Sequence, residues 1–135
     1  MFPPPPLIDV ALPPAANAPR VARQELRRVL EDASPDFTDD ALLLTSEIVS
    51  NATVIGGQCR MSAWYLANEG SLRVEIHDES AIVPVMPAAQ QSSQISGRGL
   101  RIVDAIATRW GIDREDHGKS VWFEMYVSRI APVVG

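Results

Sequence analysis

The chain has 135 residues, 46% of them hydrophobic, which is enough to bury one core and too few for two comfortable domains. Its 12 basic and 17 acidic residues give a formal net charge of -5, which opposes long-range attraction to nucleic acids and to anionic lipids. The single cysteine, Cys59, excludes an intramolecular disulfide and a cysteine-based metal cluster. Two histidines are too few for a histidine-based zinc site unless carboxylates complete it.

No apolar run approaches the roughly 18 residues of a membrane span. The stretch from Met1 to Pro6 also lacks the basic start and the small-residue cleavage site of a secretory signal. We therefore expect a soluble, cytoplasmic protein without a membrane partner.

The first third of the chain predicts a tail, an edge strand and a helix. Residues 1–6 contain four consecutive prolines, which favour a flexible, extended tail. Residues 7–12 read as an edge strand because two prolines follow them directly. A first helix is expected from Asn17 or Pro19 to Leu30, where apolar residues recur at helical spacing.

A second helix is expected from Thr38, whose hydroxyl can cap its first amides, to about Gly56. Residues 42, 45, 49 and 52 make its core-facing stripe. A neighbouring stripe carries Glu47 and Asn51 one turn apart.

The remaining sequence predicts a hairpin, a loop, a third helix and a final strand. Alternating residues over 59–66 and 72–76 flank turn residues 68–71 and predict a β-hairpin with Cys59 buried. Residues 79–94 show neither the apolar spacing of a helix nor the alternation of a strand, and this predicts a mobile loop. A helix follows Gly97-Arg98-Gly99, and a strand over residues 121–127 follows the turn at 116–119.

These elements favour an α+β two-layer sandwich, with helices on one face of a mixed, mainly antiparallel sheet. We expect a single domain over residues 7–128, between tails at residues 1–6 and 129–135.

Three groups of residues could carry chemistry, and each has a simpler interpretation. Glu47 and Asn51 suit Mg²⁺ and phosphate, with Glu47 polarising a hydroxyl or water, or they are a solvated polar pair. Asp78 ends a strand and could accept a hydrogen bond from the amine of adenine, or it only forms a turn. Gly97-Arg98-Gly99 opens a helix and could bind phosphate, whereas Arg98 could equally belong to a solvated basic face.

In chain order, residues 47–52 (EIVSNA), 78–80 (DES), 97–100 (GRGL) and 118–124 (GKSVWFE) resemble the ATP-binding boxes of the GHKL superfamily. Residues 43–52 and 97–104 are more narrowly similar to the stand-alone anti-sigma-factor serine kinases of Gram-positive bacteria, especially the actinobacterial kind. The resemblance covers about Val10 to Val127.

The resemblance implies a Bergerat-type ATP-binding fold and assigns roles to individual residues. Glu47 matches the catalytic base and Asn51 the Mg²⁺-binding residue, while Asp78 takes the adenine amine. The remaining nucleotide-binding positions are, in chain order, Ser80, Gly97, Arg98, Gly99, Leu100 and Ser120, the last being a hydroxyl residue near the adenine. Such proteins phosphorylate a serine on a small antagonist protein and sequester a sigma factor, and homodimers are common among them.

Two positions depart from the family pattern. Ile55 stands where a basic residue is usual, and an apolar side chain cannot donate a hydrogen bond to phosphate. Ser80 replaces the glycine of the adenine box, and its side chain can crowd the base. The sequence therefore leaves open an active serine kinase that uses ATP and Mg²⁺, a catalytically inactive ATP-sensing or nucleotide-independent adaptor, and a scaffold without a ligand. Trp64 and Trp110 could anchor a protein partner or lie in the core.

Overall fold

A computed structural model describes residues 4–55, 58–79 and 95–127, with the backbone alone described for residues 53–55 and 95–100. The elements in chain order are β1 (Ile8–Leu12), α1 (Ala18–Val29), α2 (Pro35–Ile55), β2 (Cys59–Leu66), β3 (Ser71–Asp78), α3 (Ile95–Ile106), β4 (Arg109–Glu115) and β5 (Gly118–Tyr126). Most of the predicted loop, residues 80–94, and the predicted tail at residues 129–135 lie outside the described residues.

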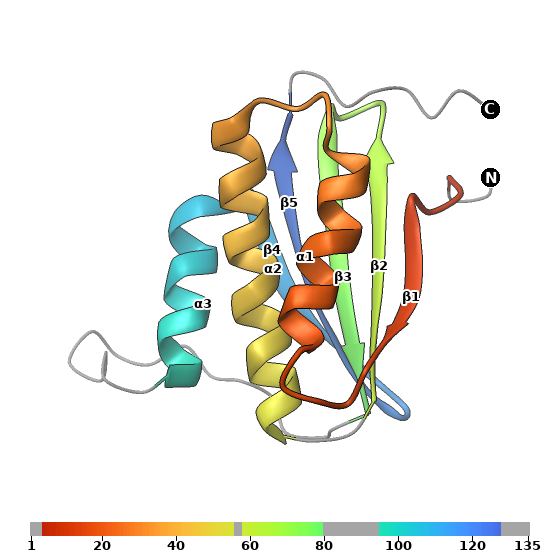
Figure 1. Cartoon of the computed structure of the whole chain (residues 1–135), viewed down its shortest axis with the longest axis vertical. Coiled ribbons are helices and arrows are strands. Elements are labelled where there is room, and N and C mark those ends of the chain that lie inside the picture. Colours follow the sequence, from red (N-terminus) through yellow and green to blue (C-terminus); the bar gives the residue numbers. More distant parts are fainter. Residues whose placement is uncertain (1–3, 56–57, 80–94, 128–135) are drawn as a thin grey trace.

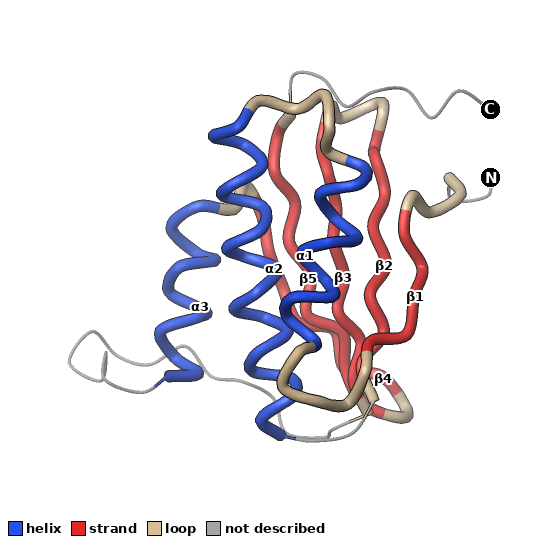
Figure 2. Tube along the Cα trace, in the orientation of Figure 1, coloured by secondary structure: helices blue, strands red, loops and turns tan. Residues whose placement is uncertain are grey.

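The five strands form one sheet in the order β1-β2-β3-β5-β4, and each of these four pairings is antiparallel. All three helices lie on one face of the sheet (Figures 1 and 2). The predicted sandwich is therefore confirmed, with β1 as the predicted edge strand. Because β5 lies between β3 and β4, those two strands run parallel to each other although they do not touch.

Alternation along the strands decides which face is covered. Ala63, Val74 and Phe123 lie side by side in register on neighbouring strands, and all three are fully buried under the helices. The helices contribute residues such as Leu26 of α1 and Leu44 of α2 to the same core. The predicted stripe of α2 is buried throughout, as are Cys59 and the other alternating residues of the predicted hairpin except Tyr65, which is half-buried.

The start of α2 differs from the prediction. The helix begins at Pro35, and the Oγ atom of Ser34 accepts a hydrogen bond from the backbone amide of Phe37 at 3.2 Å. Serine followed by proline is a favourable helix start, since the hydroxyl caps an amide and proline has no amide to satisfy. Thr38 thus lies inside the first turn, and its predicted capping role was wrong. Arg23 of α1 donates to the Oγ atom of Ser46 at 3.0 Å and links the two helices.

Strand β4 was not predicted, because its residues alternate weakly and only one of its faces meets the core. Gly111 lies within it, and a Cβ atom there would approach the ring of Trp122 to 2.8 Å. The glycine therefore gives the indole room to lie against β4. Trp110 is half-buried and donates from its ring nitrogen to Asp104 of α3 at 2.9 Å, whereas Trp64 is half-buried on β2.

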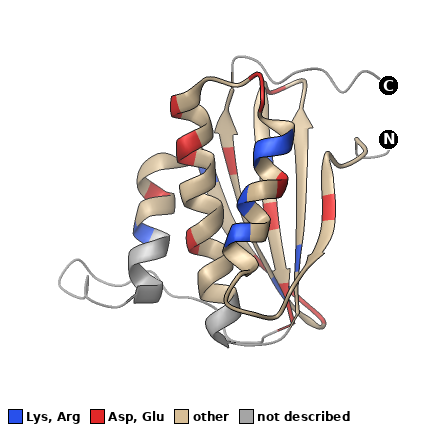
Figure 3. Cartoon of the chain, viewed as in Figure 1, with Lys and Arg blue, Asp and Glu red and all other residues tan. Residues whose placement is uncertain are grey.

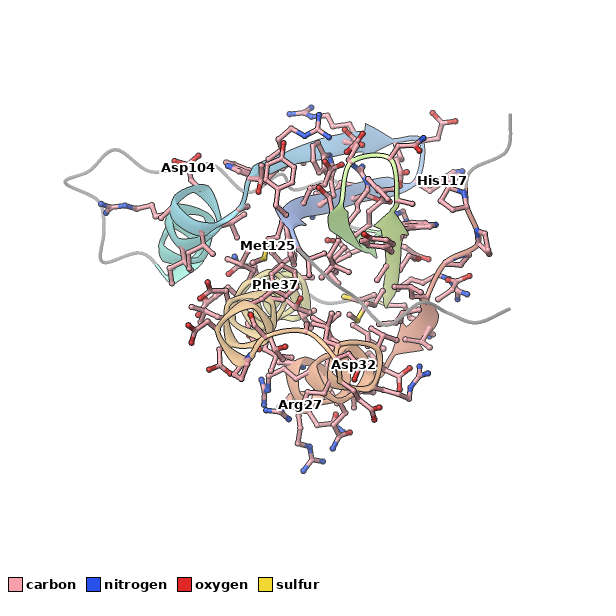
Figure 4. All side chains as sticks on the ribbon, turned by 90° about the horizontal axis from the view of Figure 1, so that it is seen from above. Arg27, Asp32, Phe37, Asp104, His117 and Met125 are labelled. Atoms are coloured by element: carbon pink, nitrogen blue, oxygen red, sulfur yellow. The ribbon has the colours of Figure 1, made fainter. Side chains whose placement is uncertain are left out.

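Among the described residues, no helix covers the other face of the sheet (Figure 4). Charged side chains form ion pairs on this face. Glu124 is 4% exposed and bonds Arg73 at 2.6 Å and Arg109 through two further hydrogen bonds. The guanidinium of Arg73 lies 4.1 Å from the ring centroid of Trp122. Burial disfavours the charged form of Arg73, but its bonds to Glu75 and Glu124 outweigh that effect and raise its pKa.

In the helix layer, the charged side chains of α1 are mainly basic and those of α2 are acidic (Figure 3). Within the described ranges, no helix is long and apolar enough to cross a membrane.

Candidate functional site

Segments that are far apart in the sequence meet at one end of the molecule. The C-terminal end of α2, the end of β3, the start of β5 and the N-terminal end of α3 all lie at the lower end in Figure 1. Asp78, the last residue of β3, pairs in register with Lys119 of β5. The fold thus gathers the segments that carry the predicted residues Asn51, Asp78 and Gly97 at the same end.

A buried ion pair lies at the centre of this end. The Nζ atom of Lys119 donates to the Oδ1 atom of Asp78 at 2.8 Å, and the two side chains are only 2% and 1% exposed. Both side chains point toward the helices, because Val121 and Phe123, two and four residues beyond Lys119, face the core. Asp78 is therefore a buried carboxylate beneath the helix layer.

The turn between β4 and β5 fixes this pair. Gly118 has a φ of 112°, and a Cβ atom on it would lie 2.0 Å from the carbonyl oxygen of Asp78. Only glycine tolerates both this backbone conformation and this approach. The turn thus presses against the end of β3 and places Lys119 beside Asp78.

Ser120 lies on the other face of the sheet. Its Oγ atom is 3.3 Å from the Oε1 atom of Glu115 and 3.4 Å from the Nδ1 atom of His77, and Glu115 and His77 are themselves 2.6 Å apart. The structure therefore does not bring the Ser120 hydroxyl to Asp78. The predicted contact of Ser120 with adenine stays a prediction. The β5 side chain that does contact Asp78 is that of Lys119.

Glu47 and Asn51 lie one turn apart on α2, as predicted, and both side chains are half-buried. The neighbouring residues Ile48 and Val49 are buried and hold this stretch of α2 against the core. Asn51 has an interaction partner, whereas Glu47 makes no hydrogen bond or ion pair within the part of the chain that the structure describes. Glu47 is therefore a half-buried carboxylate without a partner among the described residues.

The glycines of the predicted phosphate turn lie inside a helix. Helix α3 begins at Ile95, so Gly97 and Gly99 are its third and fifth residues, and Arg98 and Leu100 continue it. The prediction of a separate turn before the helix was wrong in this respect, although the segment still forms a helix N-terminus. Free amides and the positive end of the helix dipole are present in such a first turn. Ser80 lies outside the described residues.

Lys119 was missed by the prediction, although the sequence contained the signal. It is the only lysine in the chain, and it is in phase with the apolar residues of the last predicted strand. A lysine at an inward position needs a buried partner. The same phase places Ser120 on the outward face.

Burial also affects Cys59, which pairs in register with Asp78. Desolvation raises the pKa of its thiol, and the nearby Asp78 carboxylate raises it further, against a smaller effect of Lys119. The thiol of Cys59 therefore stays protonated at neutral pH, and Cys59 lies beside Asp78 in the sheet.

The residues at this end suit a nucleotide better than a metal held by the protein alone. Among the residues described, no three His, Cys, Asp or Glu side chains gather into a metal-binding group. A magnesium ion that enters with phosphates needs few protein ligands, and the carboxamide of Asn51 offers the hard oxygen that such an ion prefers. The carboxylate of Asp78 is a buried hydrogen-bond acceptor, and the N-terminus of α3 is a helix end of the kind that favours anions.

Comparisons with known proteins agree with this geometry. Residues 12–125 match the family model of the histidine kinase-like ATPase domain. The fold is similar to the crystal structure of the RsbU and RsbW domains of Rv1364c from Mycobacterium tuberculosis, with a TM-score of 0.67 and 24% identity. That match covers 96% of this chain and 34% of the other, so this chain spans about a third of its length. The comparison with curated proteins finds no match.

Proposed function

Because the chain belongs to the histidine kinase-like ATPase domain family, we propose that it binds ATP together with Mg²⁺ at the end where α2, β3 and α3 meet. The observation that carries the proposal is the buried carboxylate of Asp78, 1% exposed at the end of β3, beside the segments that hold Asn51 and the N-terminus of α3. Burying this carboxylate together with its Lys119 partner has a desolvation cost that apolar side chains would avoid, which favours a role in recognition over a purely structural one.

The proposed roles follow the chemistry of each residue. Asp78 accepts a hydrogen bond from the adenine amine, and a carbonyl oxygen in that place, as in guanine, would be repelled. The carboxamide oxygen of Asn51 meets the Mg²⁺ that accompanies the phosphates. Glu47 accepts the proton of an attacking hydroxyl, a role supported by its half-buried carboxylate, which has no partner among the described residues.

The N-terminal end of α3 is the proposed phosphate-binding segment. Free amides in its first turn favour an anion, and the small Gly97 and Gly99 allow the backbone to approach it closely. Arg98 adds a charged donor, and Leu100, Ser80 and Ser120 complete the proposed nucleotide contacts.

We further propose that the chain is an anti-sigma-like regulator in the cytoplasm, which transfers phosphate to a serine of an antagonist protein and sequesters a sigma factor. The family assignment and the free carboxylate of Glu47 support catalysis. Ile55 instead favours the alternative of a catalytically inactive adaptor, because no donor replaces the usual basic residue there. Homodimerisation and the two terminal tails remain predictions.

A thermal shift measurement tests nucleotide binding first. Saturating ATP with Mg²⁺ should raise the melting temperature, because a ligand that binds only the folded state stabilises it. No shift in a folded sample would refute the proposal. Asp78→Asn should weaken ATP binding, whereas Asp113→Asn, at an exposed position of β4, should not. The melting of each variant without nucleotide reports whether it folds.

Phosphate transfer is tested separately. The protein is incubated with γ-labelled ATP and a serine-bearing antagonist captured from the native lysate. Label on the antagonist supports the kinase, and Glu47→Gln should abolish labelling while ATP affinity stays the same. ATP binding without any labelling would favour the adaptor. Equal loss of ATP affinity in Glu47→Gln and Asp78→Asn would contradict the separate roles of these residues.

A further inference from the structure

Lys119 is an unusual residue in this chain because the only lysine of the sequence is buried. An ammonium group carries three N–H donors. Within the described residues, the Nζ atom of Lys119 reaches one acceptor, the Oδ1 atom of Asp78 at 2.8 Å. The side chain therefore has donor capacity that the described part of the protein does not use, at the end where the nucleotide is proposed to bind.

A purely structural role does not explain well why a lysine is buried at this position. Burying two charges costs several kcal/mol per ion, and well-packed apolar residues in place of a buried ion pair are often as stable or more stable. The neighbouring positions of the same face, Val121 on β5 and Ile76 on β3, show that apolar side chains fit there. A buried donor beside a buried acceptor is instead suited to a ligand that presents the opposite pair.

The backbone fixes the spacing of donor and acceptor. Asp78 and Lys119 are register partners on adjacent strands, so their side chains leave the sheet from the same face. The close approach of Gly118 to the carbonyl of Asp78 holds this register at the end of the strands. Neither backbone position can shift without disturbing the β4–β5 turn.

We propose that Lys119 is a specificity-determining residue that donates to the ring nitrogen beside the amine of adenine, while Asp78 accepts from that amine. This inference rests on the proposed function, since it needs an adenine nucleotide in the site. Adenine presents a donor amine next to an acceptor nitrogen, which is the complement of Asp78 and Lys119. Guanine in the same position presents its carbonyl oxygen to Asp78 and, on its pairing edge, an N–H to Lys119, so both contacts are unfavourable.

The test uses the intact protein and four nucleotides: ATP, 1-deaza-ATP, 7-deaza-ATP and purine riboside triphosphate. Each deaza analogue replaces one ring nitrogen beside the amine by C–H, and the last nucleotide lacks the amine. We expect one of the deaza analogues to bind roughly tenfold to a hundredfold more weakly than ATP, as for loss of a hydrogen bond to a charged group. Equal affinity of ATP and both deaza analogues would overturn the role of Lys119. Failure of ATP itself to bind would instead refute the proposed function.

Spectroscopy and variants provide the matched controls. Because Lys119 is the only lysine, labelling lysine with ¹⁵N at Nζ gives one side-chain ammonium signal to follow. This signal should move on addition of ATP and move less with the sensitive deaza analogue, and an identical shift with both would contradict the proposal.

Lys119→Met should bind ATP and that analogue with equal affinity, whereas Lys119→Arg should keep part of the difference in affinity between them. If Lys119→Met does not fold, the analogue series on the unaltered protein still decides.

Discussion

At the scale of single residues, Thr45 of α2 is a buried polar side chain whose hydroxyl has no hydrogen-bond partner in the described part of the protein. It is fully buried, and its neighbours on the same stripe are apolar. Thr45→Val exchanges the hydroxyl for a methyl group of similar size and should raise the free energy of unfolding by about 1–2 kcal/mol. Thr45→Ser keeps the hydroxyl, loses the methyl, and should lower it by about 1 kcal/mol. Urea unfolding measures both, and a less stable Thr45→Val would show that the hydroxyl is satisfied.

Cys59 predicts a dependence of stability on pH. Burial raises the pKa of its thiol in the folded state, so the folded chain keeps this proton at a pH where the unfolded chain has lost it. The sign follows from proton binding: stability is unaffected below the unfolded pKa of about 8.5 and falls as the pH rises above it. The free energy of unfolding, measured between about pH 7.5 and 9.5, should decline more steeply for the natural protein than for Cys59→Ala. Parallel curves would contradict a buried, protonated thiol.

Residue patterns predicted which elements carry the candidate site residues but not which of their side chains form pairs. The positions of Glu47, Asn51 and Asp78 followed from helical spacing and from the end of a strand, and the fold places them as expected. The pairing of Asp78 with Lys119 depends on the register between β3 and β5, and no local signal sets this register because the two residues are 41 positions apart in the chain.

At the scale of elements, the start of α2 separates two possible caps. Ser34 bonds the amide of Phe37, whereas Thr38 lies within the helix. Ser34→Ala should therefore lower the free energy of unfolding by about 1 kcal/mol, and Thr38→Ala should change it by only a few tenths. Chemical denaturation of the two variants checks this order, and the reverse order would place the cap at Thr38.

The β4–β5 turn offers a second comparison, between two glycines with positive φ. At Gly118, with φ 112°, a Cβ atom would lie 2.0 Å from backbone, whereas at Gly70, with φ 62°, the nearest atom is 3.9 Å away. Gly118→Ala should lower the free energy of unfolding by at least about 2 kcal/mol, and Gly70→Ala by about 1 kcal/mol. Gly118→Ala should also weaken ATP binding, because it moves Lys119 relative to Asp78. If calorimetry gives the same loss of unfolding free energy for both variants, the close contact between the β4–β5 turn and the end of β3 is not important for stability.

Most elements were predictable because their apolar residues follow one period over several turns or pairs. Strand β4 was not, since it alternates a half-buried face with charged residues and contains Gly111, which is disfavoured in strands. The start of α3 was misplaced for a similar reason. Two glycines in three positions predict a turn locally, but tertiary packing can impose helix on them.

At the scale of the whole molecule, the two ends of the sheet carry different groups of polar side chains. The end opposite Asp78 has a hollow of about 490 Å³, lined by Asn68, Glu69, Ser71, Thr108, Arg109 and Tyr126. The network of Glu124 with Arg73 and Arg109 lies next to it on the uncovered face. Strand β3 begins beside the hollow at Ser71 and ends at Asp78, so its length separates the two regions.

This separation predicts that substitutions near the hollow change the stability of the fold without changing its affinity for ATP. Glu124→Gln weakens the partner of two guanidinium groups and should lower the free energy of unfolding by about 2–3 kcal/mol. The dissociation constant of ATP should not change, because the altered residue lies near the far end of β5 from Lys119. Urea unfolding and titration calorimetry measure the two quantities, with Glu69→Gln, at an exposed partner of Arg109, as the milder control. A severalfold change in ATP affinity would contradict the separation.

The position of β5 in the sheet also determines the order in which the chain can fold. Strand β5 lies between β3 and β4, so β4 has no neighbouring strand among the described residues until β5 has been synthesised. Strands β1, β2 and β3 can associate with α1 and α2 before that point, whereas β4 joins the sheet only through β5. The ion pair of Asp78 with Lys119 therefore forms only after β5 has paired with β3, so that two strands distant in the chain must meet before either buried charge has its partner.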